Sequence, residues 1–126
     1  MKTEFEVKAE IRIVLSQQDI DDIMVCALEG GITYWCFKAE VVGEYLGEYA
    51  SEQISRGGML KLYDMEGGEK YWLDLDKFLN GFKLWLENDG DQYGAVENGE
   101  VDCCNIDAEC ADAIIQYALF GEVIYG

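Results

Sequence analysis

The feature that most constrains the fold of this chain is a helix-and-glycine pattern that occurs twice. Residues 21–34 align with residues 112–125 so that Asp, Ile, Ala, Leu, Gly and Tyr fall at the same offsets. In both copies apolar residues recur at helical spacing up to a glycine, and a short extended stretch follows. Glycine has no Cβ atom and adopts the left-handed conformation that ends many helices. We therefore expect two amphipathic helices that end at Gly30 and Gly121, whether the pattern is a true internal repeat or a recurrent helix–glycine–strand unit.

Other stretches carry the patterns of strands. Residues 5–15 alternate between apolar and polar side chains, which predicts a strand with one buried face. Residues 59–64 and 69–75 are two further strand-like runs, and the glycines between them favour a β-hairpin. Residues 32–47 predict irregular or extended structure, and residues 122–125 predict a terminal extended segment that can add to the sheet.

Helix signals fill the remaining chain. Ser16 and Asp19 have the spacing of a capping box at the start of the first helix. A short helix is expected over residues 49–55 and a longer one over residues 76–88. Gly81 inside the longer helix costs about 1 kcal/mol relative to Ala, so we expect a neighbouring element to pack closely there. The order of elements predicts an α+β fold with a mainly antiparallel sheet packed against three to four helices.

Composition limits the classes of partner. The chain has 126 residues, half of them hydrophobic, which fits a single domain over residues 1–126. Its 26 acidic and nine basic residues give a net charge of −17, which argues against direct binding of DNA, RNA or an anionic membrane. The sequence shows no secretory signal and no long apolar stretch, and its five cysteines are an odd number, so we expect a reduced protein in the cytoplasm.

The sequence also argues against catalysis. It contains no histidine, and histidine is the most common general base and metal ligand. It has no glycine-rich loop with the spacing of a phosphate-binding site, and no pair of carboxylates stands out as an acid and base couple. We therefore expect a protein that is not an enzyme and that uses no cofactor.

The distribution of charge gives the main functional prediction. No Lys or Arg follows Lys83, whereas acidic residues are frequent in that part of the chain. Carboxylates spaced in this way can imitate the phosphates of a nucleic acid, so we expect this run to bind a basic nucleic-acid-binding protein. The predicted partner-binding residues are Asp89, Asp91, Glu97, Glu100, Asp102 and Asp107.

Two alternatives remain open. Aromatic side chains near the first glycine pair can form a ligand pocket for a small molecule such as a signalling nucleotide. The residues predicted for this pocket are Tyr34, Trp35, Trp72, Tyr117, Gly30 and Gly31.

The second alternative is a calcium-binding structural module. Residues 89–100 resemble an EF-hand loop, with Asp89, Asp91, Glu97 and Glu100 at ligand positions. A tyrosine takes the place of one oxygen ligand, so no metal is the primary expectation.

Residues 27–35 and 114–126 resemble a widespread family of small acidic uncharacterised proteins encoded by bacteriophages and mobile elements. The resemblance covers most of the chain and implies an accessory protein that counters host defence. One such class comprises anti-CRISPR proteins that mimic DNA, and another sequesters immune signalling nucleotides. Together with the charge, the resemblance predicts a DNA-mimic inhibitor of a protein such as a CRISPR effector. Nothing in the sequence predicts the oligomeric state.

Overall fold

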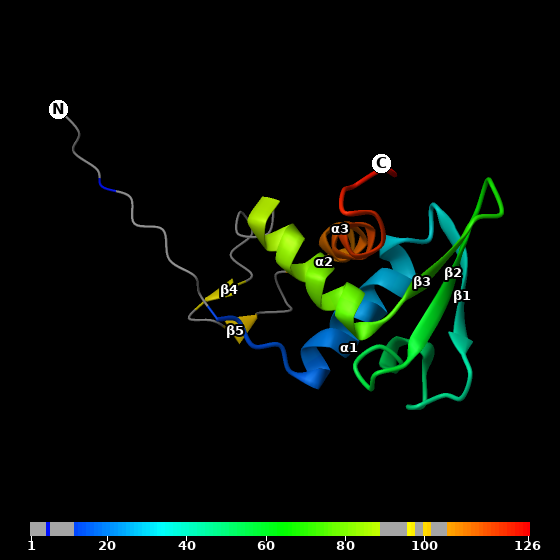
Figure 1. Ribbon diagram of the computed structural model, residues 1–126, viewed down its shortest axis with the longest axis horizontal. Coiled ribbons are helices and arrows are strands. Elements are labelled where there is room, and N and C mark those ends of the chain that lie inside the picture. The colour runs from blue at the N-terminus through cyan, green and yellow to red at the C-terminus, as the bar shows by residue number, and fades with distance from the viewer. Residues whose placement is uncertain (1–4, 6–11, 89–95, 98–99, 102–105) are drawn as a thin grey trace.

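Three antiparallel strands, β1 (Cys36–Val42), β2 (Met59–Asp64) and β3 (Lys70–Leu73), form a sheet in the order β1–β2–β3 (Figure 1). In the middle strand, Leu60 and Leu62 point to the core and are fully buried, whereas Lys61 and Tyr63 alternate with them and are only partly buried. This alternation is the expected result of a period of two along a strand with one covered face. The sheet therefore has an inner face that packs on the helices and an outer face that does not.

The computed structural model describes residues 5, 12–88, 96–97, 100–101 and 106–126. The elements in chain order are α1 (Gln17–Cys26), the π-helix η1 (Ala27–Gly31), β1 (Cys36–Val42), the 3-10 helix η2 (Ala50–Glu52), β2 (Met59–Asp64), β3 (Lys70–Leu73), α2 (Leu75–Asn88), β4 (Val96–Glu97), β5 (Glu100–Val101) and α3 (Ala108–Phe120). Strands β4 and β5 pair with each other in a second, two-stranded sheet. The predicted α+β fold, with an antiparallel sheet and three α-helices, is confirmed.

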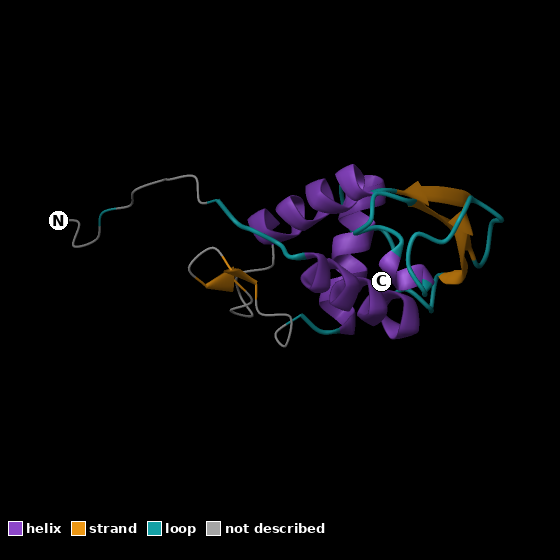
Figure 2. Cartoon of the chain, turned by 90° about the horizontal axis from the view of Figure 1, so that it is seen from below, coloured by secondary structure: helices purple, strands orange, loops and turns teal. Residues whose placement is uncertain are grey.

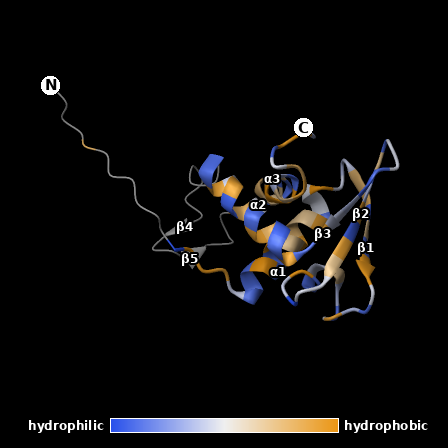
Figure 3. Cartoon of the chain, in the orientation of Figure 1, coloured by the Kyte–Doolittle hydropathy of each residue, from blue (hydrophilic) through white to orange (hydrophobic). Residues whose placement is uncertain are grey.

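The helices lie together beside the inner face of the sheet (Figures 1 and 2). Polar and apolar residues alternate around α2, as expected for a helix with one buried side (Figure 3). Phe78 and Trp85 of α2 and Ile114 and Ile115 of α3 contribute to the core. At Gly81 a Cβ atom would lie 2.6 Å from backbone atoms of α3. Helix α3 is therefore the element that packs closely against this glycine, as the sequence predicted.

The two glycine signals of the repeated pattern have different outcomes. Gly121 has the predicted left-handed conformation, with φ of 74°, and ends α3. The continuous helical segment of α1 and η1 ends at Gly31, as predicted for this glycine pair. The left-handed conformation expected there is wrong, because neither Gly30 nor Gly31 has a positive φ. A Cβ atom on Gly31 would lie 2.5 Å from the carbonyl oxygen of Ala108. Here glycine permits two helices to approach closely and does not reverse the chain.

The predicted capping box at Ser16 and Asp19 is confirmed. Most of the strand predicted over residues 5–15 lies outside the described residues. In its described part, residues 12–15 form no strand beyond a single bridge at Val14. Residues 122–125 add no strand to the sheet, because they fold back onto α3. In the part of the chain that the structure describes, no helix has the length and apolar character needed to cross a membrane.

Candidate functional site

An open hollow of about 700 Å³ lies between η1, the N-terminal half of α3 and the C-terminal segment. Four of the six residues predicted for an aromatic ligand pocket line it, namely Gly30, Gly31, Tyr34 and Tyr117. The other two lie elsewhere. Trp35 is buried in the core behind the hollow, and Trp72 is on the outer face of the sheet.

The wall that carries Tyr34 is fixed by a buried carboxylate. Asp112 is 8% exposed and accepts hydrogen bonds from the Tyr34 hydroxyl at 2.7 Å and from the Trp35 indole nitrogen at 2.8 Å. The amide nitrogen of Gln116 donates a third bond to Asp112 at 2.9 Å. A buried charge is tolerated when donors surround it in this way. Asp112 therefore orients the tyrosine.

The same carboxylate affects the tyrosine in return. Tyr34 is half exposed, but its hydroxyl turns inward, and desolvation together with the Asp112 bond raises its pKa to about 12. Tyr34 therefore stays neutral at physiological pH and presents its ring to the hollow.

Gln116 holds the C-terminal segment against the hollow. Its side-chain oxygen accepts the backbone N–H groups of Ile124 and Tyr125, both at 2.8 Å. Its amide nitrogen donates to the carbonyl oxygen of Tyr125 at 3.2 Å. One fully buried amide thus replaces the strand partner that this segment lacks.

Tyr125 anchors that segment to the sheet. Its ring stacks on Trp35 with a centroid distance of 4.8 Å and an interplanar angle of 2°. Its hydroxyl donates to Asp64 at 2.6 Å and lies 3.1 Å from the Tyr71 hydroxyl. Desolvation and the bond to Asp64 raise the pKa of Tyr125, whereas the Tyr125 hydroxyl and the backbone N–H of Glu66 lower the pKa of Asp64.

The surroundings of the hollow are acidic. Asp22, Glu29 and Asp107 lie close enough to Cys26 that, after burial, their charges raise the pKa of this thiol. Glu109 lines the hollow itself. Among the described side chains, no Lys or Arg forms an ion pair with any of these four carboxylates. We call the hollow and these carboxylates the acidic hollow.

The six residues predicted to bind a partner are only partly placed. Asp107 is the N-cap of α3, where its carboxylate accepts the backbone N–H of Cys110 at 2.9 Å and has a lowered pKa. Glu97 and Glu100 are backbone partners in the register of β4 and β5. Asp89, Asp91 and Asp102 lie outside the described residues.

The same two strands bear on the calcium alternative. An EF-hand loop leads into a helix near its end, whereas Glu100 begins β5. No group of three side chains suitable for a metal ion occurs in the described ranges.

Sequence reasoning did not assign a role to Asp112, Gln116, Tyr125 or Glu109. A partial signal was available, because Tyr125 matches Tyr34 in the repeated pattern. The chain matches no protein-family model, and comparisons with curated proteins and with solved structures find no similar protein.

Proposed function

We propose that this protein is a non-enzymatic interaction protein whose acidic hollow binds a basic surface of a nucleic-acid-handling protein. The observation that carries the proposal is an aromatic-walled hollow with Glu109 in its lining, while Glu29 and Asp107 directly precede the lining residues Gly30 and Ala108 in the chain. Among the described side chains, none of these three carboxylates has a cationic partner. Like charges that gather without neutralisation weaken a fold, so a binding role explains their position better than stability does.

The walls suit the side chains of Lys and Arg. A guanidinium or ammonium group can form an ion pair with Glu109 and at the same time contact the faces of Tyr34 or Tyr117. An exposed ion pair contributes only about 0–1 kcal/mol, so affinity requires several such contacts. The net charge of −17 adds long-range attraction to a basic partner and accelerates association.

The setting follows from the resemblance to small proteins of bacteriophages and mobile elements. We place the protein in the host cytosol, where it occupies the nucleic-acid groove of a defence protein such as a CRISPR effector. The acidic run after Lys83 extends the same charge along the chain, since it contains no Lys or Arg.

A small-molecule ligand is the second candidate, because Gly30, Gly31, Tyr34 and Tyr117 meet around the hollow. Glu109 and Asp112 in its lining would repel the phosphates of a signalling nucleotide. An aromatic compound that carries an amine fits this lining better. Native mass spectrometry of the protein purified from its host would detect such a ligand as an added mass.

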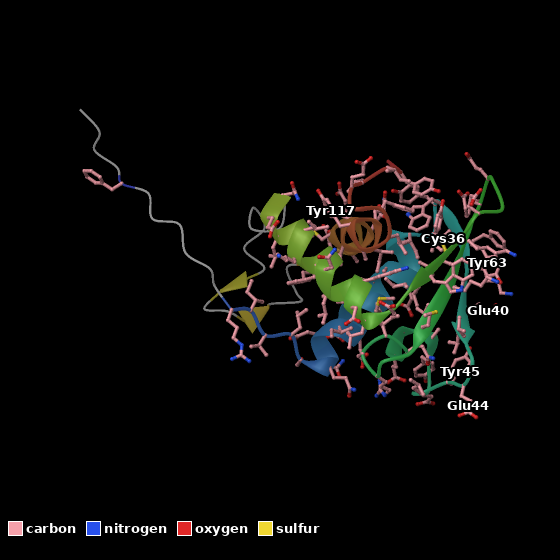
Figure 4. All side chains as sticks on the ribbon, viewed as in Figure 1. Cys36, Glu40, Glu44, Tyr45, Tyr63 and Tyr117 are labelled. Atoms are coloured by element: carbon pink, nitrogen blue, oxygen red, sulfur yellow. The ribbon has the colours of Figure 1, made fainter. Side chains whose placement is uncertain are left out.

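Charge reversal tests the main proposal. We expect Glu29→Lys with Glu109→Lys to abolish capture of basic proteins from a bacterial lysate at low salt. The matched control is Glu44→Lys with Glu48→Lys, which makes the same change of charge at exposed positions after β1. Glu44 and Tyr117 lie in different parts of the molecule (Figure 4). If the control loses capture as strongly as the test variant, net charge acts alone and the hollow is not the site.

A further inference from the structure

The outer face of the sheet differs in composition from the rest of this acidic protein. It carries three lysines and three aromatic residues on adjacent strands, namely Lys38, Lys61, Lys70, Phe37, Tyr63 and Trp72. We call these six residues the lysine–aromatic face. They include one third of the nine basic residues of the chain.

Strand register brings these side chains together. Lys38 lies opposite Tyr63, and Tyr63 lies opposite Lys70 on the next strand, so an aromatic ring is flanked by two ammonium groups. The ammonium nitrogens of Lys38 and Lys61 are both 5.3 Å from the Tyr63 ring centroid, and that of Lys70 is 5.8 Å from it. Three cations therefore converge on one ring.

The aromatic rings beside these cations are open to solvent. Phe37 is 59% exposed, and its ring centroid is 5.8 Å from that of Tyr63. Trp72 is 44% exposed, and Lys61 lies 5.4 Å from the centroid of its indole ring. Glu40 lies beside these residues, opposite Lys61 in the register, where it pairs with Lys38 at 3.0 Å and accepts the Tyr63 hydroxyl at 3.0 Å. After that pair is subtracted, the face keeps two positive charges.

We propose that the lysine–aromatic face binds a short segment of single-stranded nucleic acid, with its phosphates held by the ammonium groups and neighbouring bases stacked on Phe37 and Trp72. Cations beside exposed rings are the combination that binds single strands without sequence preference. Lysine is depleted in the cores of protein–protein interfaces, which makes an acidic protein the less suitable occupant. The site extends to only a few nucleotides, because the net charge of −17 repels a longer polyanion.

This inference goes beyond the binding of a basic protein and does not depend on it. The whole-chain charge argued against nucleic-acid binding, but it averages over surfaces that the fold separates. Figure 4 places Tyr63 on the sheet and Tyr117 away from it.

The test measures fluorescence anisotropy at low salt with labelled short strands of DNA and RNA, a DNA duplex of the same length and a poly-glutamate peptide. We expect both the DNA and the RNA single strands to bind. The duplex and the poly-glutamate peptide should bind at least ten-fold more weakly. The two remaining positive charges, each neutralising one phosphate, predict a slope of roughly −1.4 for the logarithm of affinity against the logarithm of salt concentration. Equal or tighter binding of poly-glutamate or the duplex, or no binding of either single strand, would overturn the proposal.

Variants locate the contact. Trp72→Ala should weaken binding about five-fold or more, and Lys70→Glu should reduce the salt slope by about 0.7. The matched controls are Tyr45→Ala, an exposed aromatic residue after β1, and Lys83→Glu, an exposed residue of α2. Controls that weaken binding as much as the test variants contradict the site.

An observation on the unmodified protein avoids any effect of a substitution on folding. Trp35 and Trp85 are 3% and 1% exposed, so Trp72 is the one tryptophan in contact with solvent. Stacking of a base on Trp72 should quench the solvent-exposed part of the emission. Binding without any quenching would contradict a stacked complex.

Discussion

At the scale of single residues, the folded chain depends on one amide. Gln116 is fully buried and accepts two backbone N–H groups of the C-terminal segment. Gln116→Ala leaves these donors unsatisfied, and each buried unsatisfied group costs about 1–3 kcal/mol. We expect the free energy of unfolding to fall by roughly 2–4 kcal/mol in urea denaturation. Gln18→Ala, which removes an exposed bond to Asp22, should change it by less than about 0.5 kcal/mol. Equal effects of the two substitutions would contradict a special role for Gln116.

The bond between Tyr125 and Asp64 makes a pH-dependent contribution. The pKa of Asp64 is lower in the folded protein than in the unfolded chain. The ionised carboxylate therefore stabilises the fold at pH values above its unfolded-state pKa, and this stabilisation is lost as the pH falls through its folded-state pKa. Tyr125→Phe keeps the ring that stacks on Trp35 and removes the hydrogen bond that lowers the pKa of Asp64 most. We expect the pKa of Asp64, measured by NMR, to rise, and acid unfolding to begin at a higher pH. An unchanged Asp64 pKa would show that the backbone N–H groups of Glu66 and Gly67 are sufficient.

At the scale of elements, α2 and α3 pack in direct contact at Gly81. A Cβ atom on Gly81 would lie 2.6 Å from the backbone of α3 at Ile114 and Ala118. Alanine favours a helix by about 1 kcal/mol over glycine, but backbone atoms cannot move aside as a flexible side chain can. We therefore expect Gly81→Ala to lower the thermal midpoint, with a net cost of about 1–3 kcal/mol. Asn80→Ala, at an exposed position of the same helix, should raise it slightly. A higher midpoint for Gly81→Ala would contradict close contact between the helices.

Elements whose signals are local could be predicted from the sequence. The capping box at Ser16, the glycine end of α3 at Gly121 and the hairpin of β2 and β3 depend on neighbouring residues, and all three are present. The role of Gly30 and Gly31 could not be predicted in this way, because these glycines lie against Ala108, far away in the chain.

The same limit applies to the site. The position of aromatic residues near helix ends and strands identified Tyr34 and Tyr117 as candidates for one pocket. It could not show that Asp112 accepts hydrogen bonds from Tyr34 and Trp35, which are 78 and 77 residues away in sequence. The lysine–aromatic face could not be predicted from composition, because a net charge of −17 does not show which of the nine basic residues lie together in the fold.

At the scale of the whole molecule, salt should affect stability and partner binding in opposite directions. A net charge of −17 repels itself, and exposed charges are screened beyond about 10 Å at 0.1 M ionic strength. Added NaCl should therefore raise the thermal midpoint, by about 4 °C for each 1 kcal/mol of repulsion removed. The same salt should weaken capture of a basic partner, because that attraction is also screened.

A variant with fewer charges separates these effects. Glu44→Gln with Glu48→Gln makes the net charge less negative at positions far from the acidic hollow. The thermal midpoint of this variant should respond less to NaCl, whereas its salt-dependent capture of basic proteins should stay unchanged. A midpoint that falls with added salt would mean that attractive pairs, such as Arg56 with Asp21 at 3.5 Å, outweigh the repulsion. The acidic residues would then stabilise the fold by themselves, and the position of Glu109 in the hollow would no longer require a partner.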